Sequence, residues 1–591
     1  MKNKLFYALI ASILTVFLMV SLCGCNNKST SISDSQNQTN INQNNDSDTE
    51  DATNSANIDN LGELTDKDQL TDYDNSDVTT ITFSDNGISA TDNSVSISGS
   101  TATITKKGDY IITGTTSDGQ LIVDSDKEKD VHLILDNASI TSKSSAPIYV
   151  KSADKVIITL KDGTSNYLSD SKDFTYESTA DKEPNATLFA KDSVTINGEG
   201  ELTVIANFNN GIQSKDHLKI LSGTITVTSE NDAIKGKDSL TITGGNITVN
   251  ATGDGLDSDN AEENECGYVH ITDGNITINS EGKGIKAASL IYVEDGTIDI
   301  DSTDDAINSS SDVQIDGGMI SIDTEDDAIH GDLKILINDG SIDVTSCYEG
   351  LESENITVNE GTVNISATDD GINVAGASSD SQSRNSMASD SNCALTINGG
   401  YVYINCEGDG LDSNGTVIMN DGIAIIEGPS YSANGALDYG ISFTINGGIL
   451  IAMGTSMMAE NVSDSSTQCS TLLSFTGNLT NAMISITDEN NNLIISYTAS
   501  KNWGSITFST PDLSLGNTYN VCANGTLNNS TNLGSTAYTG GTLKDGEVLG
   551  TYTQDSIVCG TGNGMSGMGG GPDGPGGPGD PPGDKPQNGW L

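Results

Sequence analysis

The strongest constraint on the fold is an internal repeat in the middle of the chain. A glycine followed by alternating apolar and polar residues recurs nine times, from Gly223-Val227 (GTITV) to Gly422-Ile426 (GIAII). Successive glycines of this motif lie 22, 29, 22, 22, 22, 21, 39 and 22 residues apart, so the basic unit has 22 residues. A repeat of this length is typical of a solenoid, in which each unit is buried only by stacking on its neighbours.

The pattern inside each unit predicts strands rather than helices. Each unit contains two or three short runs with alternating apolar residues and no helical period, which excludes leucine-rich and helical solenoids. We therefore predict an all-β fold, a parallel β-helix of about 22 residues per coil whose Ile, Val and Leu side chains stack inward. The two long gaps are insertions, around 259–266 and 374–392, after the same corner of the coil.

The repeat also divides the chain. We expect the regular parallel β-helix over 191–465 and irregular first coils over 76–190, where the period is blurred. A small antiparallel β module is expected over 466–558, where the repeat has ended but short apolar runs continue. Two flanking segments are too polar or too rich in glycine and proline to bury a core, a spacer over 26–75 and a tail over 559–591, and we predict both to be disordered.

The first 25 residues have the order of a bacterial lipoprotein signal peptide. Lysines at positions 2 and 4 precede an apolar run over 5–22, which is followed by Cys23, Gly24 and Cys25. We predict that Cys25 is acylated and that the chain is anchored by this lipid to the extracellular face of the cell membrane. The alternative is a transmembrane helix, since the apolar run is almost long enough to cross a bilayer.

Charge and cysteine content exclude several classes of partner. Acidic residues outnumber basic ones by 83 to 26, and the net charge of −57 repels nucleic acid and anionic lipid, so we expect no nucleic-acid partner and no membrane contact beyond the anchor. The cysteines after Cys25 are scattered and form no CxxC pair, which argues against a zinc site or a disulfide framework. We expect these cysteines to fill the solenoid interior, and the chain to act as a monomer.

A second motif follows each glycine-led strand by about nine residues and contains acidic residues at a tight corner, as in Asp304-Ile307 (DDAI) and Asp409-Asp412 (DGLD). Because the spacing equals one coil, acids of successive units should stack in a column, where carboxylates about 5 Å apart repel each other. Clustered oxygen donors of this kind suit calcium better than magnesium. The candidate calcium ligands form four sets: Asp232, Asp254 and Asp257; Asp304, Asp305, Asp326 and Asp327; Glu349, Glu352, Asp369 and Asp370; and Asp409 and Asp412.

Two other interpretations of this corner stay open. The acids are also explained as hydrated turn residues, since Asp favours tight turns. Lys235, Lys283 and Lys286 occupy the same corner, where they either neutralise the acids or, in the case of Lys235 or Lys286, act as a Brønsted base with a lowered pKa. Six tyrosines are expected to be exposed and are candidates for stacking on sugar rings or for packing: Tyr268, Tyr348, Tyr401, Tyr403, Tyr431 and Tyr439.

The Gly108-Tyr110 segment, the 22-residue coils and the acidic corners resemble clostridial surface proteins described as carbohydrate-binding domain-containing. The resemblance covers about 79–451. It implies a right-handed β-helix that binds calcium, cellulose and acidic plant polysaccharide and that is similar to family 9 pectate lyases. By position, the resemblance assigns Asp232, Asp254 and Asp257 to a lyase-like calcium cluster and Lys286 to the lyase base.

These observations favour a non-catalytic binder that attaches the cell to cellulose or polygalacturonate, with calcium between the acids of the protein and those of the glycan. The first alternative is a calcium-dependent pectate lyase that uses Lys286 or Lys235 as its base. The second is a surface adhesin that recognises protein.

Overall fold

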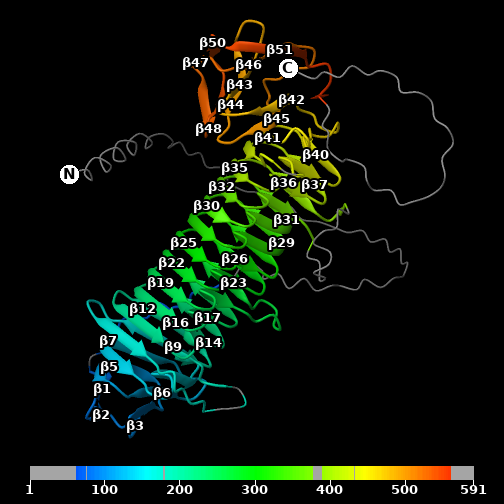
Figure 1. Cartoon of the computed structure of the whole chain (residues 1–591). Helices are drawn as coiled ribbons and strands as arrows, with labels where there is room; N and C mark the ends of the chain where they lie inside the picture. The colour runs from blue at the N-terminus through cyan, green and yellow to red at the C-terminus, as the bar shows by residue number, and fades with distance from the viewer. Residues whose placement is uncertain are drawn as a thin grey trace, which may run out of the picture. The chain divides into compact units, whose positions relative to one another are not determined.

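In the computed structural model, the described residues are 61–560, except 75, 178–179, 181, 377–388 and 432. These residues are all-β: one sheet of 44 strands is accompanied by one of six strands and one of two (Figure 1). Within the described ranges, no helix offers the apolar length that crossing a bilayer requires. The predicted signal peptide with Cys25, most of the spacer and nearly all of the tail lie outside the described residues.

The large sheet is built mainly from parallel strands stacked in three columns. The first column contains β1 (Thr79–Ser84), β5 (Gly108–Thr116), β7 (Val131–Thr141), β10 (Ser165–Ser169), β13 (Glu201–Ala206), β16 (Thr224–Ser229), β19 (Asn246–Ala251), β22 (Asn275–Ser280), β25 (Thr297–Ser302), β28 (Met319–Thr324), β30 (Ser341–Cys347), β32 (Thr362–Ala367), β35 (Tyr401–Cys406), β38 (Ile423–Glu427) and β41 (Ile449–Gly454).

The second column contains β4 (Thr101–Ile104), β6 (Gln120–Asp124), β8 (Ile148–Ser152), β11 (Ala186–Ala190), β14 (Asn210–Ser214), β17 (Ile234–Gly236), β20 (Leu256–Ser258), β23 (Ile285–Ala287), β26 (Ile307–Ser309), β29 (Ile329–Ile337), β31 (Leu351–Val358), β33 (Ile372–Val374), β36 (Leu411–Ser413) and β39 (Leu437–Tyr439).

The long strands β29 and β31 continue into the third column. The other members of that column are β9 (Lys155–Leu160), β12 (Ser193–Gly198), β15 (His217–Ile220), β18 (Ser239–Ile242), β21 (Tyr268–Ile271), β24 (Leu290–Val293), β27 (Asp312–Ile315), β34 (Ala394–Ile397), β37 (Thr416–Met419) and β40 (Ser442–Ile445). At the N-terminal end, β2 (Gly87–Ala90) pairs antiparallel with β1, and β3 (Val95–Ser98) with β4.

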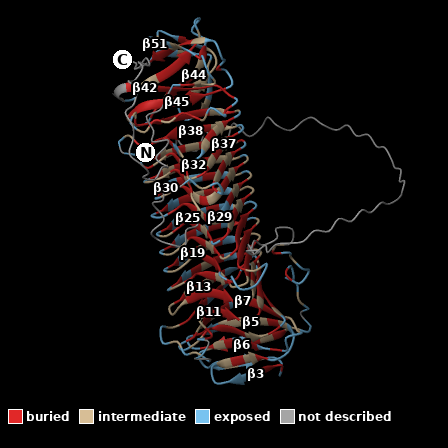
Figure 2. Cartoon of the chain, turned by 90° about the vertical axis from the view of Figure 1, so that its right-hand side faces the viewer, coloured by how far each residue is buried: buried red, intermediate tan, exposed pale blue. Residues whose placement is uncertain are grey.

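The repeated sequence pattern explains the register of the columns. Ile225 pairs with Ile247, and Ile247 with Ile276, so identical side chains stack on one another at each of these steps and stay buried. The glycine before each first-column strand from β16 to β41 has a positive φ, as at Gly245 (φ 97°), where a Cβ would also come within 2.9 Å of the Gly223 carbonyl oxygen. Strands of all three columns are largely buried in Figure 2, whereas the turns between them are exposed. Cys347, Cys393 and Cys406 belong to this core.

The C-terminal part contains β42 (Ser470–Leu479), β43 (Met483–Thr487), β44 (Leu493–Thr498), β45 (Trp503–Ser509), β46 (Thr518–Ala523), β47 (Thr526–Asn528), β48 (Thr531–Gly534), β49 (Ala537–Thr539), β50 (Thr542–Lys544), β51 (Glu547–Thr553) and β52 (Val558–Cys559). Strands β42, β45 and β52 belong to the large sheet, because β45 pairs antiparallel with both β41 and β42. The six-stranded sheet has the order β48-β49-β44-β43-β46-β51. A second core joins it to the last coils, and includes Trp503, Phe508 and Ile451.

Part of the segment predicted as a disordered spacer lies against the third column instead. Asp68 is fully buried, and its carboxylate pairs with Lys155 Nζ at 2.5 Å and Lys219 Nζ at 3.4 Å. Asn197 Nδ2 donates to the Asp68 carbonyl oxygen at 2.9 Å. A composition-based boundary misses this contact because a single buried, ion-paired aspartate can hold an otherwise polar segment in place.

Candidate functional site

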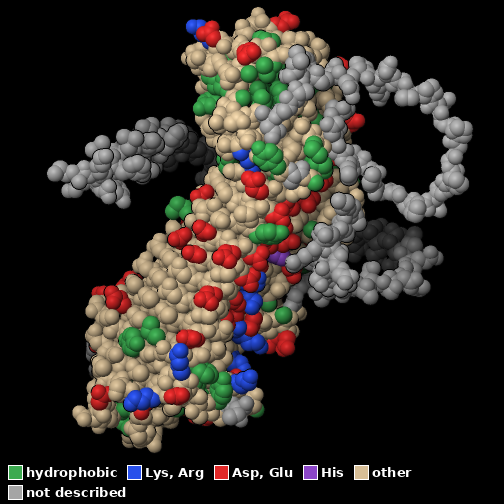
Figure 3. Space-filling view, viewed as in Figure 1, with side chains coloured by type: hydrophobic (Ala, Val, Ile, Leu, Met, Phe, Trp, Pro, Cys, Tyr) green, Lys and Arg blue, Asp and Glu red, His purple; other side chains and the backbone are tan. Residues whose placement is uncertain are grey.

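Two ladders of polar side chains run along the second column. The turn ladder comprises the residues that lie two positions before the inward Ile or Leu of each strand: Asp232, Asp254, Lys283, Asp305, Asp327, Glu349, Asp370 and Asp409. The strand ladder comprises the residues one position after it: Lys235, Asp257, Lys286, Asn308, His330, Glu352, Asn373, Asp412 and Asp438. In Figure 3 these ladders contribute to an acidic stripe with basic side chains gathered at its lower end.

The turn acids have a structural task that explains their recurrence. One carboxylate oxygen of each aspartate in the turn ladder accepts a backbone N–H of the next coil. The Lys283 N–H donates to Asp254 at 3.0 Å, and the Glu349 N–H donates to Asp327 at 3.2 Å. The Asp409 N–H donates to Asp370 in the same way at 2.6 Å. A carboxylate in this position satisfies one backbone donor and still has a second oxygen for another partner.

Among the residues that the structure describes, carboxylates from neighbouring coils converge in four groups, within each of which one ligand atom per residue lies within 4.8 Å of the others. The first group is Asp232, Asp254 and Asp257; the second is Asp304, Asp305 and Asp326; the third is Asp327, His330 and Glu352; and the fourth is Asp370, Asp409 and Asp412. The groups differ chiefly in which positive charge accompanies them.

Lysines accompany the first group. Asp257 is fully buried, and its Oδ2 lies 2.5 Å from Lys235 Nζ, which also lies 3.4 Å from Asp232. Lys286 Nζ lies 2.9 Å from Asp254. Burial raises the pKa of Asp257 to about 6 even though Lys235 opposes this shift.

Lys283 accompanies the second group. Its Nζ lies 2.8 Å from Asp304 and 2.5 Å from Asp305, which is buried. Asn308 Nδ2 also donates to Asp305 at 2.7 Å. Asp326, which is exposed, completes the group, so that three carboxylates share one ammonium.

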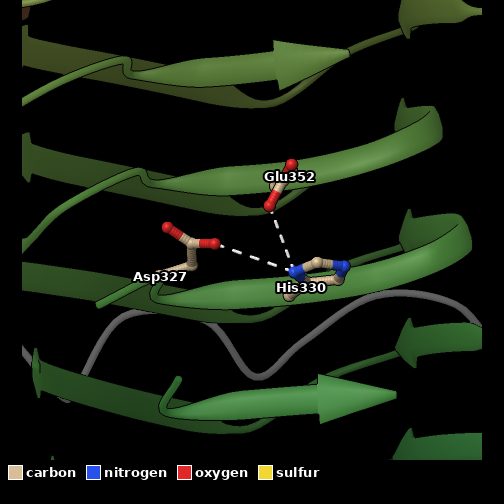
Figure 4. A group of neighbouring side chains, drawn as sticks. All are labelled: Asp327, His330 and Glu352. Carbon is tan, nitrogen blue, oxygen red and sulfur yellow. Dashed lines mark ion pairs between the residues drawn. The ribbon is translucent and has the colours of Figure 1, made fainter. Parts of the chain in front are cut away.

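A histidine accompanies the third group (Figure 4). His330 Nδ1 lies 3.1 Å from Glu352 on the next coil and 3.7 Å from Asp327 on its own coil. Burial alone lowers the pKa of His330, but carboxylates on both ring nitrogens raise it to about 12. The raised pKa favours an imidazolium at neutral pH, which provides a counter-charge for these carboxylates.

No comparable charge accompanies the fourth group: among the residues that the structure describes, no lysine lies within 4 Å of these carboxylates. Asp370 and Asp409 each accept a backbone N–H from the following coil. Asp438 follows Asp412 in the strand ladder and adds a further acid at this end. Burial, together with the neighbouring carboxylates, raises the pKa of Asp370 to about 6, of Asp409 to about 8 and of Asp412 to about 7.

The donor set of the fourth group fits a hard divalent cation. All three side chains offer oxygen, which calcium prefers, and no nitrogen or sulfur ligand competes within the group. Without a cation, ionising three neighbouring, partly buried carboxylates is unfavourable, as their raised pKa values show. Asp370, Asp409 and Asp412 are therefore the residues that would hold such an ion.

The structure regroups several candidates. Asp327, expected beside Asp304, Asp305 and Asp326, converges instead with His330 and Glu352. Glu349 accepts from Asn373 Nδ2 at 2.8 Å, and burial raises its pKa to about 9. Asp369 raises the pKa of the neighbouring Tyr348. The sequence interpretation missed His330 and Asp438, although aligning the residue after each inward Ile or Leu would have placed both in the strand ladder.

The lysines do not have the lowered pKa that a Brønsted base requires. Burial alone lowers the pKa of Lys286, but its hydrogen bond to Asp254 and the negative charges of Asp254 and Asp257 together outweigh burial and raise it. The pKa of Lys235 is also raised, because its acidic partners outweigh burial. Both side chains are thus held as ammonium ions.

The tyrosines differ in exposure. Tyr268 was expected to be exposed, and this is wrong: only 7% of it is accessible, because it packs against Leu290 and Tyr292. Tyr348 and Tyr431 are exposed, and Tyr401, Tyr403 and Tyr439 are half-buried.

Comparison with known proteins gives three findings. The family model described as "Carbohydrate-binding domain-containing protein" matches residues 98–350, 301–377 and 333–435, which together span more than half of the chain. A protein of that description from Acetivibrio thermocellus is 49% identical over 133 residues, which are 22% of this chain and 46% of the relative, so the chain spans about half the length of that curated relative. A solved structure of a polysaccharide lyase-like protein from C. thermocellum, a gadolinium derivative, is 37% identical with a TM-score of 0.35, and the match covers 45% of this chain and 96% of that one.

Proposed function

Because the chain belongs to the carbohydrate-binding domain-containing protein family, we propose that it binds plant cell-wall polysaccharide at the cell surface through calcium held by the acidic ladders. The preferred acidic glycan is polygalacturonate. Its carboxylates carry the same charge as the protein, so direct contact between the two polyanions is repulsive. A divalent cation shared by both removes this repulsion.

The observation that carries the proposal is the fourth group, where three partly buried carboxylates converge without a lysine among the described residues. Calcium takes six to eight oxygen ligands. Three side chains therefore leave ligand positions for water and for the carboxylate and hydroxyl oxygens of a sugar. In the first and second groups, lysine ammonium groups already provide positive charge.

The same proposal includes the remaining structural expectations. The columns form a right-handed β-helix with coils of about 22 residues, and the C-terminal strands form a small antiparallel module. A lipid on Cys25 attaches the chain to the outer face of the membrane. Replacing Cys25→Ala tests the anchor: the protein should move from the membrane fraction to the soluble fraction, and unchanged fractionation contradicts it.

Binding to immobilised polygalacturonate, in millimolar calcium and in chelator, tests the proposed function. The wild-type protein should be retained only with calcium, and the variant Asp370→Asn/Asp409→Asn/Asp412→Asn should lose retention at least tenfold. The matched control is Asp299→Asn/Asp301→Asn/Asp323→Asn, which removes the same charge from the outward side of the first column and should bind normally. Retention of the fourth-group variant equal to wild type overturns the proposal.

Neither alternative function has comparable support. A pectate lyase needs a neutral base, whereas the pKa values of Lys235 and Lys286 are raised. β-Elimination produces an unsaturated sugar that absorbs ultraviolet light. Rising absorbance with polygalacturonate and calcium would therefore support the lyase hypothesis. A protein-binding adhesin would bind host or sister-cell protein but no glycan.

A further inference from the structure

The outward side of the first column carries a third ladder, which lies on different strands from the acidic ladders of the second column. It runs through Thr226, Thr248, Thr277, Asp299, Ser321, Asp343, Asn364, Tyr403, Ile425 and Ile451. Its chemistry changes along the column: the first seven members are polar, one is aromatic and the last two are aliphatic. A change of this kind along equivalent positions marks a boundary between two environments.

The C-terminal strands account for the aliphatic end. Ile425 and Ile451 are fully buried in the second core, beneath residues of the C-terminal part such as Phe508. Asp343, two strands before Tyr403, is exposed. Tyr401 and Tyr403 are half-buried and pack against the edge of the second core. The two rings therefore form a step between the covered and the open part of the column.

A groove of about 470 Å³ lies at this step. It is lined by Asp343, Val344, Thr345, Asn364, Ile365, Ser366, Tyr401, Tyr403 and Ser535. Strand β48 approaches it closely, since a Cβ on Gly534 would come within 2.4 Å of the Tyr401 ring. β35 and β48 accordingly lie near each other in Figure 1.

Packing against the C-terminal part explains why aromatic rings occupy positions 401 and 403. It does not explain the polar side chains that line the groove. Asn364 is the direct neighbour of both Asp343 and Tyr403 in the ladder. An amide, a carboxylate and several hydroxyls beside two aromatic rings provide donors and acceptors next to a flat apolar surface. Few ligands combine dense hydroxyl groups with apolar ring faces, and sugars are the common class that does.

We propose that this groove is a second glycan site, which binds a neutral oligosaccharide without calcium. The proposal rests on the proposed carbohydrate-binding function but not on the acidic groups, which lie along the second column. The sugar is neutral because the lining residues include Asp343 and no lysine or arginine, so a uronate would meet like charge without a counter-ion. Burial raises the pKa of Tyr403 to about 12, so its hydroxyl remains a hydrogen-bond donor at neutral pH. The polar part of the ladder continues the open surface away from the groove and would accommodate further sugar units.

Calorimetric titration of the full-length protein with cellohexaose, xylohexaose and mannohexaose, each in chelator and in calcium, tests the proposal. At least one hexasaccharide should bind with the same affinity in both buffers. Asn364→Ala and Asp343→Ala change side chains on open strands and should each weaken binding at least tenfold. Thr226→Ala, at the equivalent ladder position six coils from Asn364, should leave binding unchanged. Tyr403→Ala should weaken binding further, and its melting temperature reports whether docking of the C-terminal part has changed.

Each other outcome overturns the proposal. Binding that disappears in chelator places the neutral sugar at the acidic ladders, and wild-type affinity in both Asn364→Ala and Asp343→Ala excludes the groove. Calcium-dependent retention on polygalacturonate with no binding of any hexasaccharide refutes the groove while leaving the proposed function intact. Absence of both refutes the two together.

Discussion

The early and late coils of the acidic ladders share one backbone pattern but differ in how their charge is balanced. In the early coils, Lys235, Lys283 and Lys286 pair with the acids at 2.5–3.4 Å. In the late coils, the strand-ladder positions equivalent to Lys235 and Lys286 hold Asn373, Asp412 and Asp438, and the turn-ladder positions equivalent to Lys283 hold Asp370 and Asp409. The same acidic corner therefore recurs along the column with a different balance of charge. Whether a corner needs an external cation depends on the residue that the neighbouring coil places beside it.

Removing calcium is expected to have the largest effect, and to act on the late coils. At calcium concentrations 100 to 1,000 times the dissociation constant, linkage stabilises the folded state by about 3–4 kcal/mol per site. Thermal melting in calcium and in chelator should differ for the wild type and for Asp232→Asn/Asp254→Asn/Asp257→Asn. The difference should nearly vanish for Asp370→Asn/Asp409→Asn/Asp412→Asn. If the first-group variant loses the calcium effect and the fourth-group variant keeps it, calcium binds the early coils and the prediction is wrong.

Removing the lysines of the first group should leave its carboxylates without a positive charge, as in the fourth group. The double variant Lys235→Gln/Lys286→Gln leaves buried carboxylates without their partners, which costs about 3 kcal/mol of stability in chelator. Calcium should restore part of this loss, and calorimetry should detect one additional bound ion relative to wild type. Unchanged ion stoichiometry would show that the first group cannot hold calcium even without its lysines. Lys501→Gln, which removes a lysine outside the ladders, is the control.

Adding a lysine should do the opposite. Asn373 lies between Glu352 and Asp412 in the strand ladder, as Lys286 lies between Asp257 and Asn308. Asn373→Lys should supply the missing positive charge, weaken calcium binding at least tenfold and reduce the melting shift on chelation. Asn373→Gln controls for side-chain length. If Asn373→Lys binds calcium as tightly as the wild type, calcium does not bind at the fourth group.

The pH dependence of stability should show the smallest effect. Burial raises the pKa of Asp409 to about 8 and of Asp412 to about 7, above the value of about 4 for an unfolded aspartate. Between these values the folded state binds more protons than the unfolded state, so stability in chelator should fall as pH rises from 5 to 8. Calcium should flatten this slope, because it binds the ionised carboxylates. A melting temperature in chelator that rises over this interval contradicts the raised pKa values. The fourth-group Asn variant should lose part of the slope and keep the part that comes from Glu349 and Asp257, whose pKa values are also raised.

The sequence alone determined the all-β architecture and the alignment of the acids. Both follow from local rules: the glycine with positive φ and the alternating inward Ile, Val and Leu recur at fixed spacing, so each coil repeats the conformation of the last. The acids of the turn ladder lie at a constant distance from those inward residues, and their stacking needs no further information. The sequence predicted less well which acids converge, because the two insertions interrupt the regular spacing. One insertion separates Asp257 from its strand partner Lys286, and the other separates Asp370 from Asp409, whose backbone N–H it accepts.

Only the tertiary structure decided the balance of charge, the docked N-terminal segment and the groove. Each depends on contacts between residues far apart in the chain: Asp68 reaches Lys155 and Lys219, and Gly534 reaches Tyr401. A periodic pattern specifies the neighbours within a ladder, since backbone pairing enforces them. It does not specify what covers a ladder from outside, because that depends on side-chain packing and charge across segments that do not share the repeat.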